Sequence, residues 1–210
     1  DQVKALNEGV DVFIATPGRL MDLFERGKIL LNGCELLVMD EAYYEFLDEP
    51  VDLLPLVRSN EKPNLLLMRT FSKIYGLAGL RIGYGIGHPD FVSALEKVRQ
   101  PFNTNSVAQA GAIAALDDDA HLASTRSTNA EGLNFFEAVC VEQGIEFVPS
   151  YANFVMLRVG DGQAVFEAMQ RQGVITRPMG GYGLPEWIRL SIGTAKENQR
   201  ATESLKAALA

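Results

Sequence analysis

The chain has 210 residues, of which 47% are hydrophobic and 22% are charged, and its formal net charge is −8. This composition argues against a disordered protein, no apolar run approaches the roughly 18 residues of a membrane span, and the acidic charge disfavours nucleic-acid partners. The first residues lack the layout of a secretory signal, so a cytoplasmic protein is expected. Two cysteines and two histidines suggest neither a disulfide framework nor a metal site, so no metal is expected.

Short apolar runs alternate with helical patterns along the first part of the chain, which is typical of an α/β fold with a largely parallel sheet. Three of these runs are predicted strands, at residues 10–15, 36–39 and 65–68. Polar residues follow the second and third strands, and open α/β sheets bind ligands at the carboxyl ends of their strands. Asp40 and Lys73 are therefore expected to face one crevice.

Towards the C-terminus the pattern changes. A helix is predicted at residues 133–141 and ends before Gly144. From about residue 145 the sequence favours a smaller α+β unit. Its predicted elements are strands at 154–159, 174–177 and 187–192 and helices at 164–172 and after the capping box of Thr194 and Glu197. This pattern divides the chain into a large domain, 1–144, and a small domain, 145–210.

The residues around the predicted crevice suit pyridoxal phosphate chemistry. A lysine among apolar neighbours, such as Lys73, has little reason to sit there unless its amine reacts, although a snorkelling surface lysine is the alternative. Asp40 could keep a pyridine nitrogen protonated, or it could simply cap a turn at the strand end. Tyr43 could donate to the phenolic oxygen of the ring, or it could be amphipathic packing.

Anion-binding groups lie nearby. Thr70 and Ser72 offer hydroxyls, and Arg81 offers a bidentate cation, so together they could bind a phosphate monoester; a surface ion pair is the alternative for the arginine. Arg177 and Arg189 each interrupt an apolar strand, where an unpaired guanidinium is costly. Both are therefore predicted to bind anions, such as a carboxylate and a second anionic group.

From about residue 37 to 209 the chain resembles the histidinol-phosphate aminotransferases, which are fold-type I pyridoxal phosphate enzymes. The resemblance is carried by VMDEAYYEF, LMRTFSKIYGLAGLRIGYGIG, KVRQPFNTNSVAQA, PSYANFV, VITRPM and WIRLSIGT. It implies part of a large domain with a mostly parallel sheet covered by helices on both faces, followed by a small α+β domain. It also implies amino-group transfer between histidinol phosphate and 2-oxoglutarate in histidine biosynthesis.

The resemblance assigns roles to individual residues. It implies that Lys73 binds the cofactor covalently and moves the α-proton of the substrate, while Asp40 contacts the pyridine nitrogen and Tyr43 the phenolic oxygen. Ser72 and Arg81 would bind the cofactor phosphate. The remaining two arginines would bind substrate, Arg189 its carboxylate and Arg177 its phosphate.

Residues 1–42 resemble instead a DEAD-box RNA helicase, in a TPGR element at 16–19 and a DEA element at 40–42. The Gly-x-x-x-x-Gly-Lys-Ser/Thr loop that binds nucleotide phosphates is not found, and acidic residues outnumber basic ones in this segment. A mosaic chain is therefore expected, in which this segment supplies a strand, a helix and a strand to the sheet.

Three functional interpretations stay open. The first is an aminotransferase, impaired because members of the family are longer and bring further cofactor and substrate residues. The second is a catalytically inactive chimeric scaffold, and the least favoured is a helicase fragment. The expected partners are a small amino donor and a 2-oxo acid, with a homodimer implied by the resemblance and no nucleic acid or membrane involved.

Overall fold

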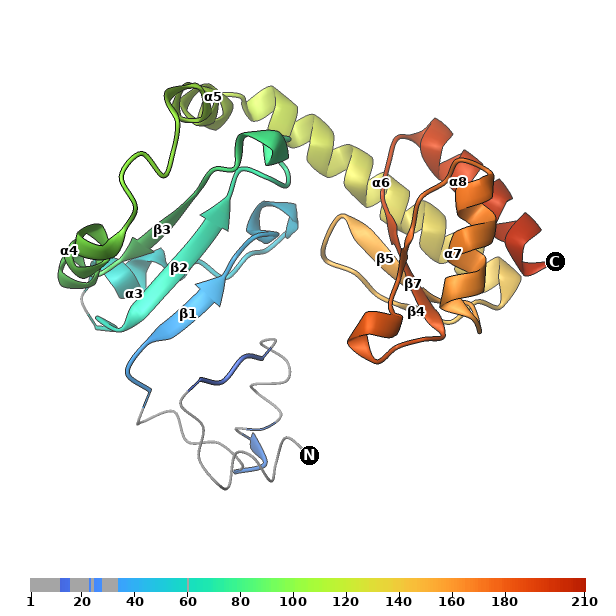
Figure 1. Ribbon diagram of the computed structural model, residues 1–210, viewed down its shortest axis with the longest axis horizontal. Helices are drawn as coiled ribbons and strands as arrows, with labels where there is room; N and C mark the ends of the chain where they lie inside the picture. The colour runs from blue at the N-terminus through green and yellow to red at the C-terminus, as the bar shows by residue number, and fades with distance from the viewer. Residues whose placement is uncertain (1–11, 16–22, 24, 28–33, 60) are drawn as a thin grey trace.

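The computed structural model describes residues 12–15, 23, 25–27, 34–59 and 61–210. They form two separate sheets, and the long helix α6 (Asp119–Gln143) runs from the neighbourhood of the first sheet to the second (Figure 1). None of the helices in these ranges is long and apolar enough to cross a membrane. Residues 12–15 have no regular secondary structure, so this part of the predicted strand at 10–15 is not a strand, and the TPGR element lies outside the described residues.

The first sheet has the strand order β1–β2–β3. Its strands are β1 (Leu37–Asp40), β2 (Leu65–Thr70) and β3 (Gly83–Gly87). β1 and β2 are parallel, with Asp40 opposite Met68, whereas β3 is antiparallel to β2. The antiparallel return follows from the short connection after β2, which contains no crossover helix. The predicted strands at 36–39 and 65–68 are confirmed.

Short helical elements surround this sheet. They are η1 (Tyr44–Phe46), α3 (Leu54–Arg58), η2 (Ala78–Leu80), α4 (Pro89–Val98) and α5 (Ser106–Leu116). α6 ends at Gly144 in the left-handed conformation, with φ at 65°, as predicted. It begins well before residue 133, where the predicted helix starts. The prediction missed the N-terminal half because that half is polar and lacks the apolar periodicity that marks a helix in the sequence.

The second sheet is antiparallel and has the order β4–β5–β7–β6. Its strands are β4 (Phe147–Val148), β5 (Phe154–Arg158), β6 (Arg177–Pro178) and β7 (Trp187–Ser191). They are accompanied by α7 (Gly162–Arg171), η3 (Gly180–Tyr182) and α8 (Ala195–Leu209), and α8 begins with the predicted capping box. β6 is shorter than predicted, because Val174 and Ile175 precede the ladder with β7.

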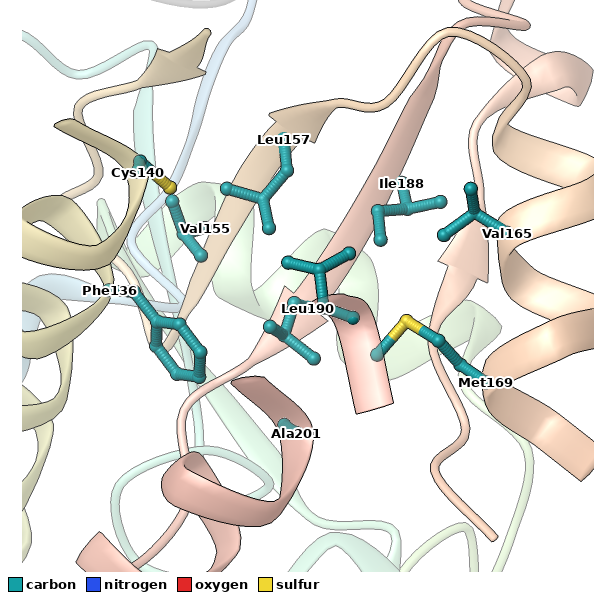
Figure 2. Close-up of a cluster of buried hydrophobic side chains, with 10 residues drawn as sticks. Phe136, Cys140, Val155, Leu157, Val165, Met169, Ile188, Leu190 and Ala201 are labelled. Atoms are coloured by element: carbon teal, nitrogen blue, oxygen red, sulfur yellow. The ribbon is translucent and has the colours of Figure 1, made fainter. Parts of the chain in front are cut away.

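The two faces of the second sheet differ. One face packs Val155, Leu157, Ile188 and Leu190 against buried side chains of α6, α7 and α8, as Figure 2 shows. The opposite face carries the alternate residues of β5 and β7, which are only partly buried. This open face is free to carry functional side chains. The domain boundary near residue 145 stays a prediction, and the last turns of α6, which precede it, contribute Phe136 and Cys140 to this core.

Candidate active site

The loop after β2 holds Lys73 in a defined position. Phe71 and Ile74 are buried on either side of it, and Ser72 and Lys73 between them are partly exposed. Backbone hydrogen bonds close the loop: the N–H of Gly76 donates to Lys73 O at 3.0 Å and the N–H of Leu77 to Phe71 O at 2.9 Å. The amine of Lys73 lies 5.2 Å from the centre of the Tyr43 ring. The buried neighbours therefore anchor the loop while the amine stays accessible.

Asp40 and Tyr43 follow the end of β1. Asp40 lies opposite Met68, and the next residue, Glu41, donates its N–H to Met68 O at 2.8 Å, so the two strand ends are held together. The Asp40 carboxylate accepts from the N–H of Ala42 at 3.1 Å, which is the turn-capping role considered as its alternative. No ion pair or hydrogen bond joins Asp40 and Lys73 in the part of the chain that the structure describes.

The groups predicted to bind a phosphate come from the end of β2 and from the loop between β2 and β3. Arg81 Nη1 is 3.5 Å from Ser72 Oγ and donates to Ala78 O at 2.8 Å. Thr70 Oγ1 accepts from the N–H of Ser72 at 3.1 Å. Arg81 has a φ of 53°, a left-handed conformation that is uncommon for a residue with a side chain. Arg81 forms no ion pair with a carboxylate among the described residues. Together with the hydroxyls of Thr70 and Ser72, it therefore suits a phosphate monoester.

Two arginines occupy the open face of the second sheet. Arg177 and Arg189 are directly opposite each other across β6 and β7, so their side chains project from the same face. Neither forms an ion pair with a carboxylate among the described residues. Like charges placed opposite each other destabilise a sheet unless an anion neutralises them. This arrangement can bind anions.

An aromatic residue that the sequence did not single out connects the two sheets. The guanidinium of Arg189 lies over the ring of Phe154, 4.7 Å from its centre. The Phe154 ring contacts the Tyr43 ring edge-on, with centres 5.9 Å apart and planes at 77°. Lys73, Tyr43, Phe154 and Arg189 thus form an unbroken series of contacts. The alternation of β5, which directs Phe154 and Met156 to the open face, is the sequence signal that could have indicated it.

A buried ion pair between Arg69 and Glu41 lies next to the candidate site, and the sequence pattern did not predict it. Arg69 Nε donates to Glu41 Oε2 at 2.8 Å, with only 11% and 9% of the two side chains exposed, and the guanidinium lies 3.8 Å from the centre of the Tyr44 ring. Desolvation lowers the pKa of Arg69, but its hydrogen bond and attraction to Glu41 outweigh that effect and raise it. Burial raises the pKa of Glu45 nearby. The pair joins the residue after Asp40 to the end of β2.

Among the described residues, His, Cys, Asp and Glu do not gather in any group of three or more that could hold a metal ion. Cys140 is fully buried, and this burial, helped by Glu137, raises the pKa of its thiol to about 11.

Comparisons with known proteins identify the family of this chain. Residues 19–205 match the family described as aminotransferase class I and II. A histidinol-phosphate aminotransferase of Akkermansia muciniphila is 52% identical over 83% of this chain and 47% of its own length, and one of Nitrosococcus oceani is 47% identical over 99% of this chain and 58% of its own. Both the family match and the second relative extend into residues 1–42, the segment with the helicase-like elements.

Solved structures agree on the fold. The histidinol-phosphate aminotransferase of Sinorhizobium meliloti, solved in complex with pyridoxal-5'-phosphate, superposes with a TM-score of 0.76 and is 30% identical, covering 90% of this chain and 52% of its own. An aspartate aminotransferase of Thermotoga maritima, 23% identical, has the same fold, with a TM-score of 0.71. The chain spans about half the length of the relatives it matches. The predicted fold-type I architecture is confirmed, and the chain belongs to the class I and II aminotransferase family.

Proposed function

We propose that this chain supplies the lysine-bearing part of a pyridoxal phosphate-dependent aminotransferase that acts on histidinol phosphate and 2-oxoglutarate in histidine biosynthesis. The carrying observation is that Lys73, on a loop anchored by buried neighbours, lies beside Tyr43 with an anion-binding set on one side and two unpaired arginines on the other. The names of the relatives support the choice of substrate.

The donor set around Lys73 fits the cofactor. Ser72 and Arg81 would bind its phosphate, with Thr70 orienting the Ser72 backbone through the 3.1 Å hydrogen bond. Lys73 would hold it covalently, while Asp40 would contact the pyridine nitrogen. Bound there, pyridoxal phosphate supplies an electron sink for the α-carbon of an amino acid or amine.

The rest of the site would bind substrate and move its proton. Tyr43 lies within reach of the Lys73 amine and would donate to the phenolic oxygen of the cofactor. Arg189 would bind a carboxylate of 2-oxoglutarate and Arg177 the phosphate of histidinol phosphate, and the two arginines lie side by side on the open face. Once released from the cofactor, the Lys73 amine would take the α-proton of the substrate and return it.

Titration with pyridoxal phosphate tests the proposal. The wild-type protein is expected to develop a visible absorbance band. Borohydride reduction should bleach this band and fix the cofactor covalently, with the added mass located by mass spectrometry on the peptide that contains Lys73. Lys73→Ala should abolish the band, and Lys97→Ala on α4 is the matched control that should retain it. A colourless wild-type protein, or a band that survives in Lys73→Ala, would overturn the proposal.

Turnover of histidinol phosphate with cofactor in excess separates an active enzyme from an inactive scaffold. Turnover that disappears in Lys73→Ala supports the enzyme. The proposal includes a cytoplasmic homodimer without nucleic-acid partners, and sedimentation measures the oligomeric state. A helicase-related role for residues 1–42 has no supporting observation, because the aminotransferase similarity extends into that segment.

A further inference from the structure

Phe154 touches both halves of the proposed site at once. It begins β5 and lies opposite Ser191 of β7, so Arg189 is its diagonal neighbour on the same face. Diagonal pairs of this kind are within reach of aromatic and long side chains. The ring of Phe154 supports the Arg189 guanidinium at 4.7 Å and contacts the Tyr43 ring at 5.9 Å. In the described part of the chain, no other aromatic ring lies against both the Arg189 guanidinium and the Tyr43 ring.

The backbone on both sides of the ring is fixed. The side chain of Asn129, which is buried on α6, donates from Nδ2 to Ala152 O at 3.1 Å. The N–H of Ile192 donates to Asn153 O at 2.9 Å. A strand start held from two elements gives the Phe154 ring little freedom to move. The ring therefore provides a preorganised surface for a guanidinium rather than a flexible one.

We propose that Phe154 is a positioning residue that holds Arg189 at a set distance from Lys73 and so determines how tightly the carboxylate of a 2-oxo acid is bound; this inference rests on the proposed function. Arg189 needs such support because Arg177 lies directly opposite and repels it. An aromatic face attracts a guanidinium and limits its orientations, whereas an aliphatic side chain of similar size offers only contact area. Through Tyr43, the same ring fixes the second sheet against the segment that follows β1.

The chain contains its own reporter for this test. Trp187, the only tryptophan in the sequence, lies two residues before Arg189 on β7 and projects from the same face. Titration of 2-oxoglutarate is therefore expected to change tryptophan fluorescence with a saturable curve. The comparison uses Phe154→Leu, which removes the ring, Phe154→Tyr, which keeps it, and Phe147→Leu on neighbouring β4, which removes a partly buried ring that makes no contact with Arg189.

Phe154→Leu is expected to weaken 2-oxoglutarate binding by about 2-fold to 30-fold, the range of a lost cation–π contact. Phe154→Tyr and Phe147→Leu should bind as the wild type does. The inference is overturned if wild-type fluorescence shows no saturable response, if Phe154→Leu binds as tightly as Phe147→Leu, or if Phe154→Tyr is as weak as Phe154→Leu. Since Phe147→Leu loses the same volume from the same sheet, a purely structural defect would appear in both leucine variants.

Kinetics separate positioning from general damage. The Phe154→Leu variant should raise the KM for 2-oxoglutarate by a similar factor and lower kcat by less, because Phe154 contacts Arg189 directly and reaches Lys73 only through Tyr43. An equal fall in kcat with no change in KM would overturn the inference. If pyridoxal phosphate gives no band but the Trp187 response still depends on Phe154, the proposed function fails and the positioning role of Phe154 stands.

Discussion

Removal of Glu41 should destabilise the protein strongly, because it leaves a buried charge without its partner. Arg69 and Glu41 are joined at 2.8 Å with about a tenth of each side chain exposed, and Arg69 Nη2 is buried with no hydrogen-bond partner in the described structure. In Glu41→Ala, the guanidinium would keep its contact with the Tyr44 ring, 3.8 Å from the ring centre, and its interaction with Tyr84, but it would lose its hydrogen-bonded carboxylate. Most of the compensation for the desolvation of Arg69 would then be lost.

The magnitude follows from the burial of both partners. Breaking a buried ion pair by removing one partner costs about 3–5 kcal/mol, whereas replacing both partners with apolar residues of similar volume is often close to neutral. Glu41→Ala should therefore cost about 3–5 kcal/mol of unfolding free energy. The double variant Glu41→Leu with Arg69→Met should recover most of that loss, since no buried charge is left in it.

Urea denaturation measures both free energies. The control is Glu96→Ala, which breaks an exposed pair with Arg99 on α4 and should cost no more than about 1 kcal/mol. The reasoning is refuted if Glu41→Ala is no more destabilising than Glu96→Ala. It is also refuted if the double variant is at least as unstable as the single one, because the loss would then come from packing and not from an unpaired charge.

Two further predictions concern the start of α8 and the two cysteine thiols. Thr194→Ala removes the cap of α8 and should cost about 0.5–2 kcal/mol in thermal unfolding. Hydrogen bonds from the backbone and side chain of Thr194 lower the pKa of Glu197. Their contribution to the unfolding free energy is therefore present above the ordinary carboxyl pKa and is lost as the pH falls through the lowered pKa. The stability loss of Thr194→Ala should shrink in acid, and a loss independent of pH would contradict the capping box. With its pKa raised to about 11 by burial and Glu137, Cys140 should resist iodoacetamide at pH 8 in the folded protein while partly exposed Cys34 reacts, and equal labelling of the two thiols would disagree.

Local patterns predicted the elements that carry the site, because those patterns act over a few residues. The apolar runs before Asp40 and Lys73 end in polar residues, and this alone indicated two neighbouring strand ends, which β1 and β2 provide. The capping box of α8 and the glycine end of α6 were equally local. By contrast, the first half of α6 has no apolar stripe and could be recognised as helix only from the structure.

Pairings between distant segments could not be predicted in this way. The sequence around Glu41 contains no pattern that predicts Arg69, 28 residues further on, as its partner. Nor does the sequence reveal that Arg177 and Arg189 are opposite each other, because the register of β6 on β7 depends on how the chain turns between them. Phe154 is ordinary as a strand residue, and its importance becomes visible only through its contact with Tyr43, which follows β1 of the other sheet.

The position of the proposed site between two sheets has a physical reason. A cofactor that is held covalently needs an amine on a rigid loop, and Lys73 has one that is anchored by the buried Phe71 and Ile74. Arginines that bind a substrate need an open face with room for an anion, which the second sheet provides because its other face is already filled by α6, α7 and α8. The two requirements are met by different layers, so their separation must be fixed by side chains that bridge them. Tyr43 and Phe154 are placed to do this, and rigid rings transmit a fixed distance better than flexible chains.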